Sequence, residues 1–230
     1  MKKIGLIGGV TWTSTIDYYK LINQKSNQVL GKHHNAEMII YSVNFEPVLE
    51  KMTDGEWNII QQEFINKAIA LKKSGADFFA IASNTLAKVG AAVSQKSGLP
   101  IVDMIKSVAD FILLKNISRV GFLGTSFAME NGFYKKELKK FGIEAIIPDK
   151  NNRNEVNRII MEELAFDILK SESREKIKNI INNLHEQKQV QGVILGCTEL
   201  PLLIKQKDTN IPVFDTTAIH ADSIIERAKK

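Results

Sequence analysis

The sequence is poor in cysteine and histidine. Cys197 is the only cysteine among 230 residues, and there are four histidines. A single thiol excludes an internal disulfide and is typical of proteins from a reducing compartment, so we expect a cytoplasmic location. No second thiol accompanies it, and no pair of histidines shows the spacing of a helical metal site, so the sequence predicts no metal.

Long apolar runs and blocks of one charge are also missing. No apolar run approaches the length of a membrane span. Ile4–Val10 is broken by three glycines and no small-residue cleavage site follows, which indicates a strand and not a signal peptide. The net charge of +5 arises from 31 basic and 26 acidic residues that are mixed along the chain. Such mixing is typical of solvated helix faces, so we expect neither a membrane nor a nucleic-acid partner.

The glycines near the N-terminus do not form a nucleotide-binding motif. Gly5, Gly8 and Gly9 lack the G-x-G-x-x-G spacing. The next predicted strand ends at Asn44 without the acidic residue that would bind a ribose. We therefore expect no nucleotide cofactor.

The chain does contain an internal repeat. Ile4–Gly9 resembles Val120–Thr125, and the apolar run that leads to Ser83 resembles the run that leads to Cys197. Both pairs are separated by close to half of the chain length, which indicates two similar halves. If the halves face each other, Ser83 and Cys197 lie on opposite walls of one cleft.

Strands alternate with helices through both halves. Strands are predicted at 3–7, 36–43, 77–82, 100–103, 119–123, 144–147, 190–195 and 212–214, and the main helices at 56–73, 86–95, 107–114, 131–141, 154–169, 174–184, 200–205 and 217–229. This alternation predicts an α/β fold of two similar doubly wound parallel-sheet domains, related by a pseudo-twofold axis and facing each other across a cleft. The first domain would comprise residues 1–100 plus 208–230, and the second 101–207.

Cys197 follows a predicted buried strand and precedes a predicted helix. Ligands of open α/β sheets bind at the carboxyl ends of strands, which favours a functional thiol. A buried, inert cysteine is the alternative. Backbone N–H groups and the helix dipole at such a position lower a thiol's pKa, and the resulting thiolate can attack a carbonyl or take a proton from carbon. The same N–H groups could hold a carboxylate, with help from Thr85 and Thr198, or these threonines could simply cap helices.

A nucleophilic cysteine would need a histidine base. His33 and His34 precede a strand, and His185 lies in a charged helix. Only His220, which follows another strand end, is expected near the cleft. A plain polar position on the last helix is an equally good interpretation of His220.

Five segments together resemble the aspartate/glutamate racemase family. They are Ile4–Thr15, Ser83–Thr85, Gly121–Thr125, Gly196–Leu200 and Asp215–His220, and they span nearly the whole chain. The resemblance implies a cofactor-independent enzyme of two similar α/β domains that acts on a small-molecule amino acid and forms a homodimer.

The family pattern implies roles for particular residues. Two cysteines usually flank the substrate α-carbon, and Cys197 matches the second, which serves the L-enantiomer. Ser83 stands where the first cysteine is usual. Ala87 stands where the family often has histidine, and some relatives carry a lysine near Ala165. The resemblance thus implies that Cys197 thiolate abstracts the α-proton of aspartate or glutamate and that Ser83 or water returns it.

The implied substrate-binding residues are mostly small and polar. Asn84, Thr85, Thr125 and Thr198 would hold the α-carboxylate and stabilise the carbanion. Trp12, Asn44, Glu163 and His220 complete the set, although Glu163 could instead be a surface carboxylate on a helix. The alternatives are a one-cysteine isomerase or decarboxylase of the same superfamily, or a catalytically inactive amino-acid-binding protein.

Overall fold

The computed structural model describes residues 1–230 and consists of two compact α/β units. The first unit comprises Met1–Met104 and His220–Lys230, and the second comprises Ile105–Ile219. The sequence predicts the second boundary after residue 207. In the structure it falls later, because the last strand pairs with the sheet of the second unit.

The first unit has a three-stranded parallel sheet. Its strands are β1 (Ile4–Gly8), β2 (Met38–Ser42) and β3 (Phe78–Ile81), in the order β2-β1-β3, and its helices are α1 (Trp12–Leu30), α2 (Phe45–Thr53), α3 (Trp57–Lys73), α4 (Ala87–Ser97) and most of α11 (Thr216–Lys229). The strand predicted at 100–103 is a single bridge between Phe79 and Ile101. Helix α2 was not predicted, and its first turn contains Pro47, a position at which helices tolerate proline.

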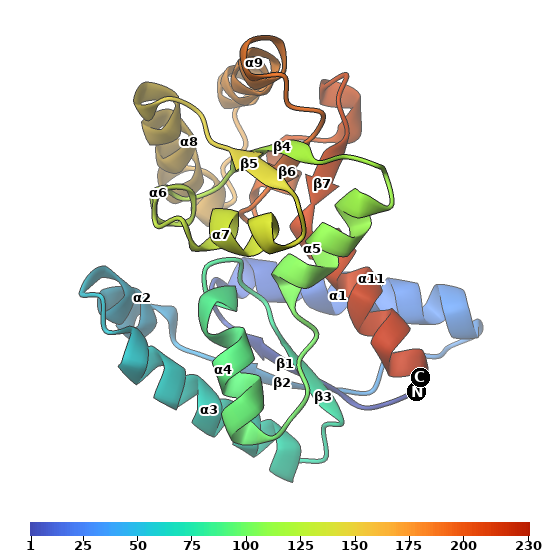
Figure 1. Cartoon of the computed structure of the whole chain (residues 1–230). Coiled ribbons are helices and arrows are strands. Elements are labelled where there is room, and N and C mark those ends of the chain that lie inside the picture. The colour runs from blue at the N-terminus through green and yellow to red at the C-terminus, as the bar shows by residue number, and fades with distance from the viewer. The chain divides into compact units, whose positions relative to one another are not determined.

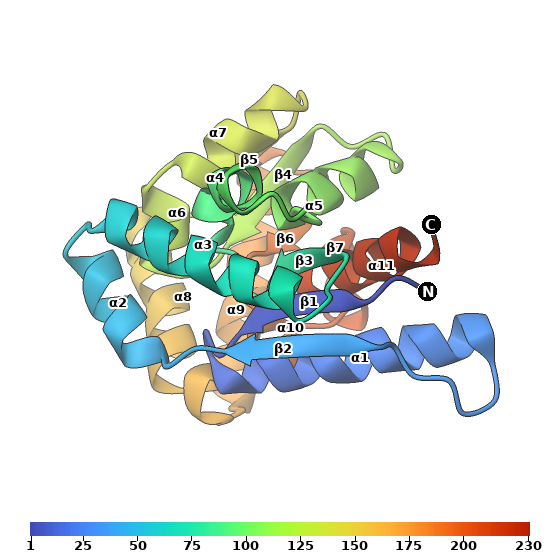
Figure 2. The same cartoon turned by 90° about the horizontal axis from the view of Figure 1, so that it is seen from below.

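Helices cover the first sheet on both faces (Figure 1). The residues Val48, Ile60, Phe64 and Leu86 of α2, α3 and the turn before α4 pack with Ile7 and Phe79 in one buried cluster. On α1 and α11, Tyr18 and His220 make an edge-to-face contact with ring centroids 5.6 Å apart. The two termini lie together in this unit, where Lys2 N donates to Ala228 O at 2.8 Å (Figure 2).

The second unit repeats the plan with four parallel strands. Its strands are β4 (Arg119–Leu123), β5 (Glu144–Ile146), β6 (Val193–Leu195) and β7 (Val213–Asp215), in the order β5-β4-β6-β7. The helices are α5 (Met104–Leu113), α6 (Ser126–Glu130), α7 (Phe133–Lys140), α8 (Lys150–Glu162), α9 (Ser171–Lys188) and α10 (Leu200–Leu203), with 3-10 turns η1 (Leu164–Phe166) and η2 (Gln206–Asp208). The prediction of two similar units with parallel sheets is confirmed.

Close packing of β4 against β6 fixes the chain just before the cysteine. Gly196 N donates to Leu123 O at 2.6 Å. A Cβ atom on Gly196 would lie 2.2 Å from Cε2 of Phe122, so only glycine fits between these strand ends.

None of the helices is both long and apolar enough to cross a membrane.

Candidate active site

Three neighbouring strands of the second unit end at one edge of its sheet. Leu123 of β4 is paired with Leu195 of β6, and Leu195 is paired with Asp215 of β7. Since these strands are parallel neighbours, the segments that follow them leave the sheet at the same edge. Cys197 belongs to the middle segment, so the predicted placement of the thiol at a strand end agrees with the structure.

Cys197 is hydrogen-bonded to a carboxylate. Its Sγ donates to Glu199 Oε2 at 2.8 Å, and Thr198 Oγ1 donates to the same oxygen at 2.8 Å. All three side chains are buried. Glu199 lies in the family segment Gly196–Leu200 but is not among the predicted site residues. Its position two residues after the only cysteine is the sequence feature that could have identified Glu199 as a site residue.

The expected lowering of the Cys197 pKa is wrong. Burial raises the pKa of the thiol well above its ordinary value, and the negative charge of Glu199 and its hydrogen bond raise it further. Hydrogen bonds from the backbone N–H groups of Glu199 and Thr198 lower the pKa of the thiol, but the effects that raise it are larger. The following helix, α10, has only four residues and begins three residues after Cys197, so its dipole contributes little. Cys197 therefore rests as a thiol and not as a thiolate.

Ser83 occupies the equivalent position in the first unit. It lies two residues beyond the end of β3, as Cys197 lies two residues beyond the end of β6. Its Oγ accepts a hydrogen bond from Leu86 N at 3.3 Å. Ser83 and Asn84 are buried, and Thr85 is half-buried. The repeat noted in the sequence is thus a repeat of local structure.

Thr125 is the N-cap of α6. Its Oγ1 accepts from Ala128 N at 3.3 Å, at the end of β4 and on the same sheet edge as Cys197. Capping and ligand binding are compatible for this residue, because a hydroxyl that accepts one hydrogen bond keeps its own proton to donate.

Glu163 and His220 have their polar atoms engaged within the protein. Glu163 is buried and accepts from Ser173 Oγ at 2.6 Å and from Arg158 Nη1 at 2.8 Å. Burial acts to raise the pKa of Glu163, but its hydrogen bonds with Ser173, Arg158 and Lys170 outweigh burial and lower it. These contacts indicate a structural carboxylate that joins α8 to α9.

The fully buried His220 bridges three segments of the first unit. Its Nε2 lies 2.8 Å from Val102 O, and its Nδ1 lies 2.8 Å from Tyr18 Oη. Because a carbonyl only accepts, Nε2 carries the proton and Nδ1 accepts from the tyrosine hydroxyl. Burial lowers the pKa of His220 to about 4, so the ring is neutral at physiological pH. This geometry indicates a structural role.

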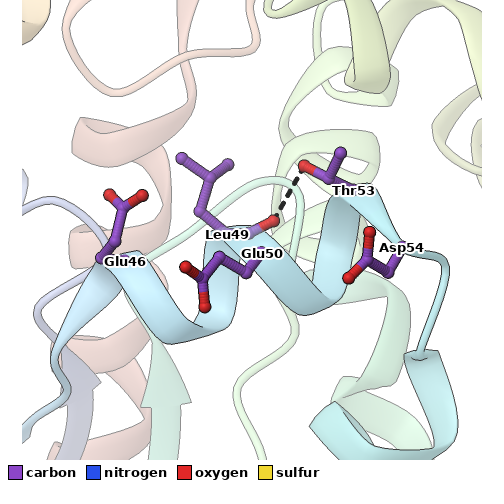
Figure 3. Close-up of a pocket in the computed structure, with 5 residues that line it drawn as sticks. All are labelled: Glu46, Leu49, Glu50, Thr53 and Asp54. Atoms are coloured by element: carbon purple, nitrogen blue, oxygen red, sulfur yellow. Dashed lines mark hydrogen bonds between the residues drawn. The ribbon is translucent and has the colours of Figure 1, made fainter.

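Trp12 and Asn44 lie at the surface. Trp12 opens α1 and is 67% exposed, and Asn44 precedes α2 without a side-chain hydrogen bond to the helix. Farther along α2, an open hollow of about 410 Å³ runs along one helix face (Figure 3). Its lining residues are Glu46, Leu49, Glu50, Thr53 and Asp54. Three carboxylates in the hollow would repel an anionic substrate, so we do not place the substrate there.

A buried thiol hydrogen-bonded to a carboxylate, at the carboxyl edge of a parallel sheet, is suited to moving protons to and from carbon. The two parallel-sheet units define an α/β class of protein, with the candidate site at the edge of one sheet. The family model of Asp/Glu/Hydantoin racemases matches residues 7–224, so the chain belongs to this racemase family.

Individual relatives agree with the assignment over full length. A Yersinia pestis protein provisionally assigned as an Asp/Glu racemase is 43% identical, with a TM-score of 0.94 and 100% of both chains covered. An aspartate racemase homologue from Pyrococcus horikoshii OT3 is 42% identical, with a TM-score of 0.90 and the same coverage. The broad specificity amino-acid racemase RacX of Bacillus subtilis (strain 168) is 24% identical over 235 residues, which is 96% of each chain.

Proposed function

We propose that the protein is a cofactor-independent racemase of a small α-amino acid, with aspartate or glutamate as the first candidates. The observation that carries the proposal is the hydrogen bond from Cys197 Sγ to Glu199 Oε2. The likeness to the Pyrococcus horikoshii aspartate racemase homologue supports aspartate, and the likeness to the broad specificity racemase supports a wider range of amino acids.

Glu199 supplies the base that Cys197 needs. Its Oε2 takes the thiol proton, and the thiolate then takes the α-proton of the substrate, so that an S–H bond forms as the Cα–H bond breaks. The electron pair left on carbon is delocalised into the substrate carboxylate. An α-proton is a very weak acid, and a thiolate with a raised pKa is a better match for it than one with a lowered pKa.

The planar intermediate needs donors for its oxyanion and a proton for its other face. Asn84, Thr85, Thr125 and Thr198 are the proposed donors. Ser83, directly or through a water molecule, is the proposed source of the returning proton. This part of the proposal rests on the equivalence of Ser83 with Cys197 in the two units and on the family resemblance.

Proton exchange in heavy water tests the function. The protein is incubated with single L-amino acids, α-deuteration is followed by NMR, and the enantiomers are separated by chiral chromatography. We expect α-deuteration and inversion of aspartate or glutamate, and loss of both in Cys197→Ser. A decarboxylase or another isomerase would give a different product in the same spectra, and an inactive binding protein would bind amino acids without exchange.

A homodimer in the cytoplasm is the assembly and location that we propose. The family resemblance supports the dimer, and the lone reduced cysteine supports the location. Light scattering coupled to gel filtration would measure the mass of the assembly, and a monomer mass would contradict the proposed dimer.

A further inference from the structure

One buried side-chain atom lacks any hydrogen-bond partner, the hydroxyl oxygen of Thr217. The residue is only 3% exposed. A buried hydroxyl without a partner costs free energy comparable to a lost hydrogen bond, and such groups in native proteins call for a specific explanation. A bound ligand that pairs with the hydroxyl is one explanation, and a structural water molecule is the other.

Thr217 lies at the same sheet edge as the thiol. Leu195 of β6 and Asp215 of β7 are partners in the sheet, and Cys197 and Thr217 each come two residues after them. The intervening Thr216 donates from Oγ1 to Leu195 O at 2.9 Å, which ties the start of α11 to the end of β6. The fixed turn therefore holds Thr217 beside the segment that carries Cys197.

The backbone around Thr217 is held independently of its hydroxyl. Asp215 Oδ1 accepts from Thr217 N and from Ala218 N, both at 3.0 Å, and caps the 14-residue helix α11. Because the turn is held by these bonds and by Thr216, it does not need the Thr217 hydroxyl. The Thr217 hydroxyl has no partner within the protein and lies at the N-terminal, positive end of α11, so it is suited to donate a hydrogen bond to an anion.

We propose that Thr217 is a substrate-binding residue whose hydroxyl donates a hydrogen bond to a carboxylate of the α-amino acid bound beside Cys197. The inference rests on the proposed function and adds a contact to it. It also predicts that the unpaired hydroxyl is satisfied only in the complex, so its removal should weaken substrate binding more than folding.

Two valine substitutions separate binding from folding. Thr217→Val keeps the shape of the side chain and removes the hydroxyl, and Thr216→Val is the matched control whose hydroxyl has a partner. We expect Thr217→Val to lower kcat/KM for α-proton exchange of L-aspartate by about 10- to 100-fold, the cost of a lost hydrogen bond to a charged group, with an unchanged or raised Tm. Thr216→Val should lower Tm, and Thr217→Ser should keep kcat/KM within about threefold of wild type.

Each contrary outcome is distinct. A fall in Tm of Thr217→Val as large as that of Thr216→Val would show that the hydroxyl serves folding, with or without a water molecule, and would overturn the inference. If the wild type exchanges the α-proton and Thr217→Val has the same kcat/KM as the wild type, the inference is overturned and the proposed function stands. Absence of exchange by the wild type with every amino acid would remove both. Should Thr217→Val fail to fold, Thr217→Ala replaces it in the same comparison.

Discussion

Glu199 Oε2 lies 2.8 Å from Cys197 Sγ and accepts a hydrogen bond from the thiol. The carboxylate therefore does two opposed things to the thiol. Its charge makes the thiolate harder to form in the free protein, and in the proposed mechanism its oxygen takes the thiol proton.

The first prediction concerns the reactivity of the thiol. Because burial and Glu199 raise the pKa of Cys197, iodoacetamide labelling against pH should have a midpoint above that of a free cysteine, about 8.5. Glu199→Gln removes the charge, so the midpoint should move down. The same variant should lose about 10²-fold or more in kcat for α-proton exchange, because the base is gone. A midpoint below that of free cysteine in the wild type would contradict the assignment of a resting thiol.

The second prediction concerns the two enantiomers. A hydroxyl is a much weaker acid than a thiol, so abstraction should be easier from the Cys197 side than from the Ser83 side. We expect L-aspartate to exchange its α-proton readily in heavy water and D-aspartate to exchange slowly. Ser83→Cys should raise exchange of the D-form more than that of the L-form, and Ser83→Ala is the control that adds no thiol. Equal exchange of both enantiomers by the wild type would show that the second face has a base as competent as Cys197.

The third prediction follows from the buried histidine. The pKa of His220 is about 4 in the folded protein and about 6.5 when unfolded. Between pH 6.5 and pH 4 the unfolded chain protonates His220 and the folded protein does not. The contribution of the neutral histidine to the free energy of unfolding is therefore fully present above pH 6.5 and is lost as the pH falls toward 4. The loss is on the order of 3 kcal/mol.

Urea unfolding at pH 7 and pH 4 measures this contribution. His220→Gln cannot take up the proton and should have a smaller pH dependence than the wild type over this window. His185→Gln is a control histidine variant outside the first unit. Equal pH dependence in wild type and His220→Gln would show that the histidine does not contribute.

The fourth prediction separates the two interpretations of Glu163. Its carboxylate is 2% exposed, whereas the neighbouring Glu162 is 66% exposed and lies 3.6 Å from the same arginine, Arg158. Glu163→Ala should cost about 2–4 kcal/mol of unfolding free energy, because Ser173 and Arg158 lose a buried partner. Glu162→Ala should cost less than about 0.5 kcal/mol. A Glu163→Ala variant of full stability that had lost substrate binding would assign the residue to the substrate instead.

Most strands could be predicted because they are buried on both faces. A continuous apolar run such as Phe78–Ile81 is visible in the sequence, and so is the glycine or polar residue that ends it. Helix α2 was missed because its pattern is short and contains a proline. The segment predicted as a strand at 100–103 makes only one bridge to β3. The number of hydrogen bonds that a short apolar run makes with its neighbour cannot be predicted from its sequence.

The positions of Cys197 and Ser83 after strand ends could be predicted from the sequence, but the direction of the Cys197 pKa shift could not. Cys197 and Ser83 lie at strand ends as expected, because strand ends follow from the apolar pattern. The sign of the thiol's pKa shift depends on which rotamer Glu199 adopts and on how deeply the turn is buried, and neither is set by local sequence. The same applies to His220, whose partners Tyr18 and Val102 are distant in sequence.

The return of α11 to the first unit sets an order of completion during synthesis on the ribosome. The second unit is one uninterrupted stretch, Ile105–Ile219, whereas the first needs both ends of the chain. Tyr18 is synthesised 202 residues before its partner His220. The later-made unit can therefore fold before the earlier one is closed. A chain truncated before residue 220 should carry a complete second unit and an open first one, with the face of α1 that carries Tyr18 left bare.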